Sequence, residues 1–142
     1  MAGVVGRVAL AAWSDHQPSR LTPVAISAGV AAAGAAALAA LQAGPSYALL
    51  LAIAALIGFF AFGWYGPWVV FVAEAAPGRA VGTTLALAMT ANQLAIVIAP
   101  PIFGLIYDLS DSYSVPLLVT AVFLVIVAVR VWLVARRLPV GR

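Results

Sequence analysis

The stretch GWYGPWVVFVAEAAPGRAVGTTLALAMTANQLAIVIAPPIFGLIYD, residues 63–108, decides how the chain folds. It holds the second half of one long apolar segment, a short polar turn and the whole of the next apolar segment. The turn carries one acid, Glu74, and one base, Arg79, among Pro and Gly residues that break helices. Long apolar segments that are joined by so short a turn predict two helices that cross a membrane in opposite directions.

The composition of the whole chain also points to a membrane. Of its 142 residues, 65% are hydrophobic and 8% are charged, whereas a soluble domain carries about 25% charged residues. The arginines stand mainly at the ends of apolar runs, where they act as membrane anchors rather than as ligands of nucleic acid. We therefore predict an integral membrane protein that has the lipid bilayer as a partner and no nucleic acid.

The apolar runs predict an all-α fold, a polytopic bundle of transmembrane helices in a single membrane domain over residues 1–142. The four full spans are residues 22–42, 47–73, 83–107 and 115–135. Residues 3–13 form a partial span, because a helix of that length reaches only about half of a hydrocarbon core roughly 30 Å thick. We expect the front of a longer protein to be missing.

Charge predicts the orientation of these spans. One side of the membrane receives five arginines, and the opposite loops contain Asp108 and Asp111 but no arginine. The five are Arg20, Arg79, Arg136, Arg137 and Arg142. The positive-inside rule then places the C-terminus in the cytoplasm, with the protein in the plasma (inner) membrane.

Span 22–42 is very rich in small residues. Ala25, Gly29, Ala33 and Ala37 recur every four positions and so share one face of the helix. Small residues let two helix backbones approach closely in lipid, which predicts that this face packs against another helix.

Prolines predict two bends in the remaining spans. Pro67 cannot donate a hydrogen bond to the carbonyl of Gly63, and the pair Pro100 and Pro101 should kink or fray the helix after Ala99. These residues are either hinges for gating or static kinks.

Polar and aromatic side chains inside the spans are the candidates for a substrate pathway. Trp64 and Trp68 lie one turn apart with Tyr65 beside them, and these rings either stack on a solute or pack against lipid. Asn92 and Gln93 are costly in so apolar a run unless they meet partners or water, so they either bind a solute or bridge two helices. Thr90 shares a face with Gln93, whereas Asn92 lies about 100° round the helix, so the two carboxamides need not face one cavity.

No constellation for catalysis or metal binding emerges from the sequence. The chain has no cysteine, one histidine, no suitable carboxylate pair and no lysine for a phosphate-binding loop, so we predict no enzyme, cofactor or metal site. His16 is interpreted as an interfacial residue, and Arg130 as a side chain that snorkels to the cytoplasmic surface. No acid lies deep in a span, so we expect no carboxylate proton relay within this chain.

Two stretches resemble the major facilitator superfamily. GRVALAAWSDHQPSR, residues 6–20, is similar to its short cytoplasmic-loop signature between helices eight and nine. Gly6, Arg7, Ser14, Asp15 and Arg20 match that signature, whereas Ala11, His16 and Pro18 depart from it. Residues 63–113 resemble helices ten and eleven, and the matching positions are Glu74, Pro77, Arg79, Pro101, Gly104, Asp108 and Tyr113.

The resemblance covers nearly the whole chain and implies the C-terminal part of a transporter, from the end of helix eight to helix twelve. Such transporters rock two six-helix halves about a central site, which implies a small-molecule substrate and the missing N-terminal half as partners. Spans 47–73 and 83–107 would line the cavity, which would hold no fixed cation for an anion unless Arg7 faces inward. The alternative is a small membrane subunit that does not transport, or an inactive truncated product.

Four loop residues on the cytoplasmic side are assigned to gating: Asp15, Arg20, Glu74 and Arg79. We expect Asp15 to pair with Arg79 near the N-terminus of helix 83–107, where the helix dipole favours an acid. The alternative is a solvated pair that contributes little to stability.

Overall fold

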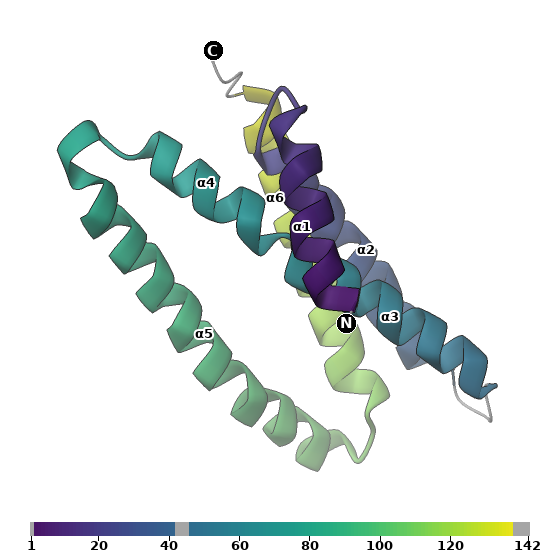
Figure 1. Ribbon diagram of the computed structural model, residues 1–142. Helices are drawn as coiled ribbons and strands as arrows, with labels where there is room; N and C mark the ends of the chain where they lie inside the picture. Colours follow the sequence, from purple (N-terminus) through teal and green to yellow (C-terminus); the bar gives the residue numbers. More distant parts are fainter. Residues whose placement is uncertain (1, 42–45, 138–142) are drawn as a thin grey trace.

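The computed structural model describes residues 2–41 and 46–137, and every regular element in those residues is helical (Figure 1). The helices are α1 (Ala2–Asp15), α2 (Leu21–Ala40), α3 (Tyr47–Gly63), α4 (Tyr65–Ala75), α5 (Val81–Ser110) and α6 (Ser114–Arg137), with a 3₁₀ turn η1 (Gly78–Ala80). The sequence also predicts a tight turn at residues 43–46. Residues 43–45 of that turn and the tail with Arg142 lie outside the described residues.

The described helices confirm the predicted all-α class. Four helical segments are long and apolar enough to cross a membrane: Leu21–Ala40, Tyr47–Ala75, Gly78–Ser110 and Ser114–Arg137. The second of these contains both α3 and α4, and the third contains η1 and α5. α1 is shorter, with 14 residues.

The core of the molecule is built around α2, which packs against α6 and α3, while α1 packs against α3. Half of the most apolar stretch of α2 is buried, and nearly all of the residues buried there are small or medium in size. Figure 1 shows α1, α2, α3 and α6 gathered together, whereas α5 runs apart from them for most of its length. The small side chains of α2 let its backbone approach those of α3 and α6 closely.

The predicted small-residue face of α2 is wrong as a packing face. Ala25 is buried, but Ala33 and Ala37 are exposed, and a Cβ added at Gly29 would meet nothing within 4 Å. Residues four apart drift round a helix by about 40° at each step, so the row moves from the packed face to its edge. Gly29 and Ala33 line a cavity between α2 and α6 there. The tight contact is instead at Gly34, where an added Cβ would come within 2.5 Å of the Ile57 side chain of α3.

A second close approach joins α1 to α3 at two buried glycines. A Cβ added at Gly6 would overlap the backbone of Phe59, including its carbonyl oxygen. A Cβ added at Gly63 would collide with the Leu10 side chain and lie 3.0 Å from the carbonyl oxygen of Gly6. The two backbones can cross here only because neither glycine has a side chain.

The two proline sites behave differently. α3 ends at Gly63 and α4 begins at Tyr65, so the helix is interrupted just before Pro67, where the sequence predicts a bend. By contrast, α5 continues through Pro100 and Pro101 to Ser110, so the expected fraying after Ala99 is wrong. In lipid, unwinding would expose further backbone groups that have no partner, and the helix geometry therefore persists around the prolines.

The turn from α5 to α6 is short and closed by local contacts. Asp111 adopts a left-handed conformation with φ 48°, and its N–H donates to the carbonyl of Tyr107 at 2.8 Å. The rings of Tyr107 and Tyr113 stack with their centres 4.2 Å apart. The hydroxyl of Ser114 donates to the carbonyl of Ala39 at 3.1 Å and so ties this turn to α2.

Candidate functional site

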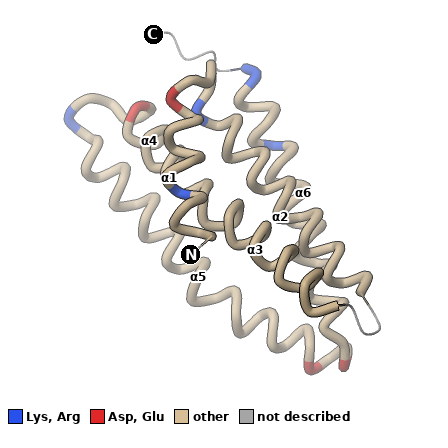
Figure 2. Tube along the Cα trace, turned by 45° about the vertical axis from the view of Figure 1, so that its right-hand side comes forward, with Lys and Arg blue, Asp and Glu red and all other residues tan. Residues whose placement is uncertain are grey.

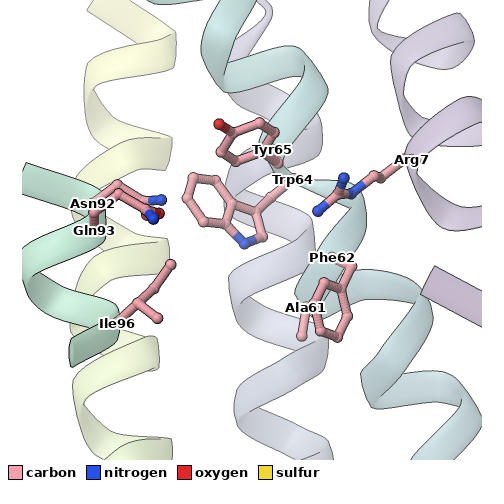
Figure 3. A pocket seen from close by; sticks show the side chains of 8 residues that line it. All are labelled: Arg7, Ala61, Phe62, Trp64, Tyr65, Asn92, Gln93 and Ile96. Carbon is pink, nitrogen blue, oxygen red and sulfur yellow. The ribbon is translucent and has the colours of Figure 1, made fainter. Parts of the chain in front are cut away.

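A cleft of about 360 Å³ lies between α1, the junction of α3 and α4, and α5 (Figure 3). Its walls are Arg7, Ala61, Phe62, Trp64, Tyr65, Asn92, Gln93 and Ile96. In Figure 3 the indole of Trp64 lies between the guanidinium of Arg7 on one side and the carboxamides of Asn92 and Gln93 on the other. Side chains from α1, α3, α4 and α5 therefore converge on one space.

The cleft lies away from the ends of the helices that form it. Arg7 is about two turns before the end of α1 at Asp15, or roughly 12 Å along the axis. Trp64 is the single residue between α3 and α4, near the middle of the segment Tyr47–Ala75. Asn92 is about three turns into α5, which has 30 residues. Asn92 and Gln93 are thus well inside an apolar segment, and Arg7 lies part-way along the shorter α1. Asn92 is half-buried, whereas Arg7 and Gln93 are exposed in the described chain.

Aromatic contacts hold the wall formed by the helix junction. The ring centre of Trp64 lies 5.9 Å from that of Tyr65 and 5.5 Å from that of Trp68, and both pairs meet edge to face. The phenol of Tyr65 donates to the sulfur of Met89 at 2.9 Å, which joins α4 to α5. These contacts fix the rings that face the cleft.

Four of the six predicted pathway residues line this cleft. Trp64, Tyr65, Asn92 and Gln93 do so, and the two carboxamides share one cavity although they are neighbours in the helix. Thr90 is outside the lining, and its hydroxyl donates to the carbonyl of Ala86 in its own helix at 2.8 Å. A threonine that bonds to its own helix in this way has no free donor for a solute.

Trp68 lines a different cavity of about 350 Å³ between α2, the α3–α4 junction and α6. Its walls are apolar except for Ser27, which is 1% exposed and whose hydroxyl has no hydrogen-bond partner among the described residues. Trp64 lines both cavities and so forms the partition between them.

From the sequence, the cavity contains a fixed cation only if Arg7 faces inward. Its guanidinium faces the cleft and lies 5.3 Å from the centre of the Tyr65 ring, the geometry of a cation–π contact. The signal in the sequence is a base within an apolar run, two turns before the polar loop. Arg7 therefore provides a fixed positive charge in this cleft.

A cluster of charges lies at one end of the bundle, and Arg20 is its centre. The Arg20 guanidinium pairs with Asp15 and, at 3.0 Å, with Glu74, and it also donates to the Ser14 hydroxyl at 3.3 Å. The hydrogen bonds that Arg20 donates to Glu74 and then to Asp15 raise its pKa above the usual value. The guanidinium therefore stays charged and joins the end of α1 to the end of α4.

The expected pair of Asp15 with Arg79 is wrong, because Arg20 occupies the carboxylate of Asp15. Arg20 immediately precedes α2, and its side chain reaches both acids, whereas Arg79 lies in η1 and is exposed. In the described part of the chain, no three His, Cys, Asp or Glu side chains gather to hold a metal ion.

Comparison with known proteins gives one consistent result. The family model described as Major Facilitator Superfamily matches residues 1–142. Two proteins named as uncharacterized MFS-type transporters, from Mycobacterium tuberculosis strains CDC 1551 / Oshkosh and ATCC 25618 / H37Rv, are each 38% identical to this chain over 103 residues. The aligned part is 72% of this chain and 23% of each relative, so the chain spans about a quarter of their length. No solved structure gives a significant match.

Proposed function

Because the chain belongs to the major facilitator superfamily, we propose that it forms the C-terminal part of a secondary transporter, from the end of helix eight to helix twelve. The transporter moves a small solute by alternating access, and the cleft between α1, the α3–α4 junction and α5 is one side of the solute pathway. The observation that carries this proposal is the convergence of Arg7, Asn92 and Gln93 on one cleft part-way along the helices that form it.

The cost of these polar groups supports a pathway. Charged and carboxamide side chains within the hydrocarbon region are expensive unless they face the protein interior or a cavity that contains water. In the proposed assignment the cleft helices are eight, ten and eleven. α2 and α6, which pack against each other, are nine and twelve. This matches the division between cavity and periphery that the resemblance to the family implies.

The same proposal gives the junction of α3 and α4 a mechanical role. The interruption at Trp64, between Gly63 and Pro67, lets α4 change its angle to α3 while the aromatic wall of the cleft moves with it. Arg20 holds the end of α4 through Glu74 and the end of α1 through Asp15, so breaking these pairs releases α4. Arg79, Pro100 and Pro101 remain proposed gating and hinge residues.

Charge supports an orientation for the proposed transporter. Figure 2 shows the described basic residues toward one end of the bundle or part-way along helices, whereas the end where α5 meets α6 carries only acidic residues. We propose a cytoplasmic C-terminus in the inner membrane, following the positive-inside rule. Alkaline phosphatase fused after Arg137 should be inactive, and an active fusion would reverse the orientation.

The direct test is transport by the complete protein in liposomes, with a panel of labelled organic anions, cations and neutral solutes. At least one solute should enter faster than in liposomes without protein. Asn92→Ala or Gln93→Ala should then lower its rate by about tenfold, because a cleft hydrogen bond of roughly 1.4 kcal/mol is lost. Leu94→Ala, next to them but outside the cleft lining, is the control. Absence of entry for the whole panel, or full activity of both carboxamide variants, would refute the proposal.

A further inference from the structure

We propose that the cleft takes a small organic monocarboxylate, with its carboxylate on Arg7 and its apolar body against Trp64 and Tyr65. This inference rests on the proposed transport function, because it names the class of solute that the same cleft carries. It is argued from the charge of the cleft, the geometry of its donors and the nature of its remaining walls.

Arg7 brings a positive charge into the cleft without an acid from the described chain to balance it. The four acids of the sequence are Asp15, Glu74, Asp108 and Asp111, and all of them lie at or near helix ends. The ion pairs found in residues 2–41 and 46–137 both use Arg20, not Arg7. Arg7 is exposed in the described chain, and a guanidinium part-way along a membrane helix is costly unless it meets water or a counter-charge. An anion in the cleft supplies that counter-charge.

The geometry of Arg7 favours a carboxylate. Its guanidinium lies over the ring of Tyr65, 5.3 Å from the centre. A guanidinium is planar and carries its N–H donors in that plane, where they can bind both oxygens of one carboxylate. The contact with Tyr65 restricts the position of the guanidinium before the solute arrives, which lowers the entropy cost of binding.

The other walls set the number of charges and the shape of the solute. Asn92 and Gln93 are neutral donors and acceptors, and the Tyr65 hydroxyl already donates to Met89. Among the described lining residues, one guanidinium therefore balances one negative charge. Trp64, Tyr65 and Phe62 present rings, which suit a planar or apolar body. Figure 3 shows Arg7 and the carboxamides on opposite sides of Trp64. A solute could therefore place its carboxylate on Arg7 and a polar group at its other end on Asn92 or Gln93.

The test uses the complete transporter in lipid nanodiscs and three probes that share one ring: benzoate, benzamide and benzylammonium. Binding is measured by titration calorimetry. Benzoate should bind at least about tenfold more tightly than the other two, because only it forms a charge-assisted bidentate pair. Arg7→Gln should abolish this preference, whereas Arg7→Lys should keep part of it, because lysine offers the charge without the fork.

Arg130→Gln is the matched control, because Arg130 is the other arginine within a predicted span and lies on α6, outside the cleft lining. It should bind benzoate as the unaltered protein does. The proposal is overturned if none of the three probes binds, if benzamide or benzylammonium binds as tightly as benzoate, or if Arg7→Gln keeps the preference. The last result, with a lowered melting temperature, would mean that an acid elsewhere in the protein pairs with Arg7.

Flux of the same probes into liposomes separates this inference from the function on which it rests. Entry of benzamide or benzylammonium with no preference for benzoate would keep the transport function and overturn the carboxylate assignment. Tight and Arg7-dependent binding of benzoate, with no flux of any solute, would keep the carboxylate site and overturn transport.

Discussion

α2 and α5 are both long apolar helices, yet their surroundings are opposite. Half of the most apolar stretch of α2 is buried, whereas none of the corresponding stretch of α5 is. Half of the buried positions of α2 are alanines, but α5 exposes large side chains such as Leu94 and Ile98. Hydropathy therefore identifies the helices that enter lipid, and side-chain size decides which of them can pack tightly. The loosely packed helix is the one that carries the carboxamides of the cleft.

The largest expected effect comes from adding one methyl group where the packed region is tightest. Gly6→Ala should destabilise the complete protein by about 3 kcal/mol, because the new Cβ meets the backbone of Phe59, which cannot rotate away. Gly104→Ala on α5 is the matched variant, since nothing lies within 4 Å of that position in the described chain. Thermal unfolding in detergent gives the comparison. A loss at Gly104 as large as that at Gly6 would show that α5 is as closely packed as α1.

A smaller effect is expected within α2 itself. Gly34→Ala should cost about 1–2 kcal/mol, because the new Cβ crowds the Ile57 side chain, which can move only in part. Gly29→Ala should cost nothing, because no atom of another helix in the described chain lies within 4 Å of the new Cβ. Both variants add one methyl group to the same helix, so their difference in melting temperature measures the effect of the contact with Ile57. Equal losses would mean that α2 is packed all round and would weaken its contrast with α5.

The smallest effect belongs to the charged end of the bundle. A double-mutant cycle on Asp15 and Arg20 should give a coupling of about 0.5 kcal/mol, because Asp15 is 64% exposed and water screens the pair. The cycle on Asp15 and Arg79 should give none. Both cycles use urea or thermal unfolding of the complete protein at low salt. A coupling confined to Asp15 and Arg79 would restore the pairing expected from the sequence.

Much of the fold follows from the sequence because lipid imposes simple constraints. Runs of apolar residues must form helices in a bilayer, since every backbone group needs an internal partner there. The polar and aromatic residues in such runs are conspicuous, and for this reason the sequence alone points to Asn92, Gln93, Trp64 and Tyr65 as candidates. Each of these residues stands out within its own segment, so it can be identified without knowing how the helices pack.

The remaining features depend on how helices rotate against each other. Arg7 faces the cleft and Trp68 faces the second cavity because of the angle at which α1 and α4 meet their neighbours, which no single segment encodes. The packing of α2 at Gly34 depends on the position of Ile57 on another helix. The choice of Asp15 between Arg20 and Arg79 depends on the reach of two flexible side chains.

The shared wall at Trp64 has an optical consequence. Trp64 borders a cleft lined by charge and carboxamides and also a cavity lined almost wholly by hydrocarbon, so its indole lies between surroundings of different polarity. Indole emission moves in wavelength with the polarity around the ring, and three other tryptophans can be exchanged for phenylalanine. The chain thus carries a fluorophore beside the proposed solute pathway. Its emission wavelength would report whether the cleft contains water or a solute.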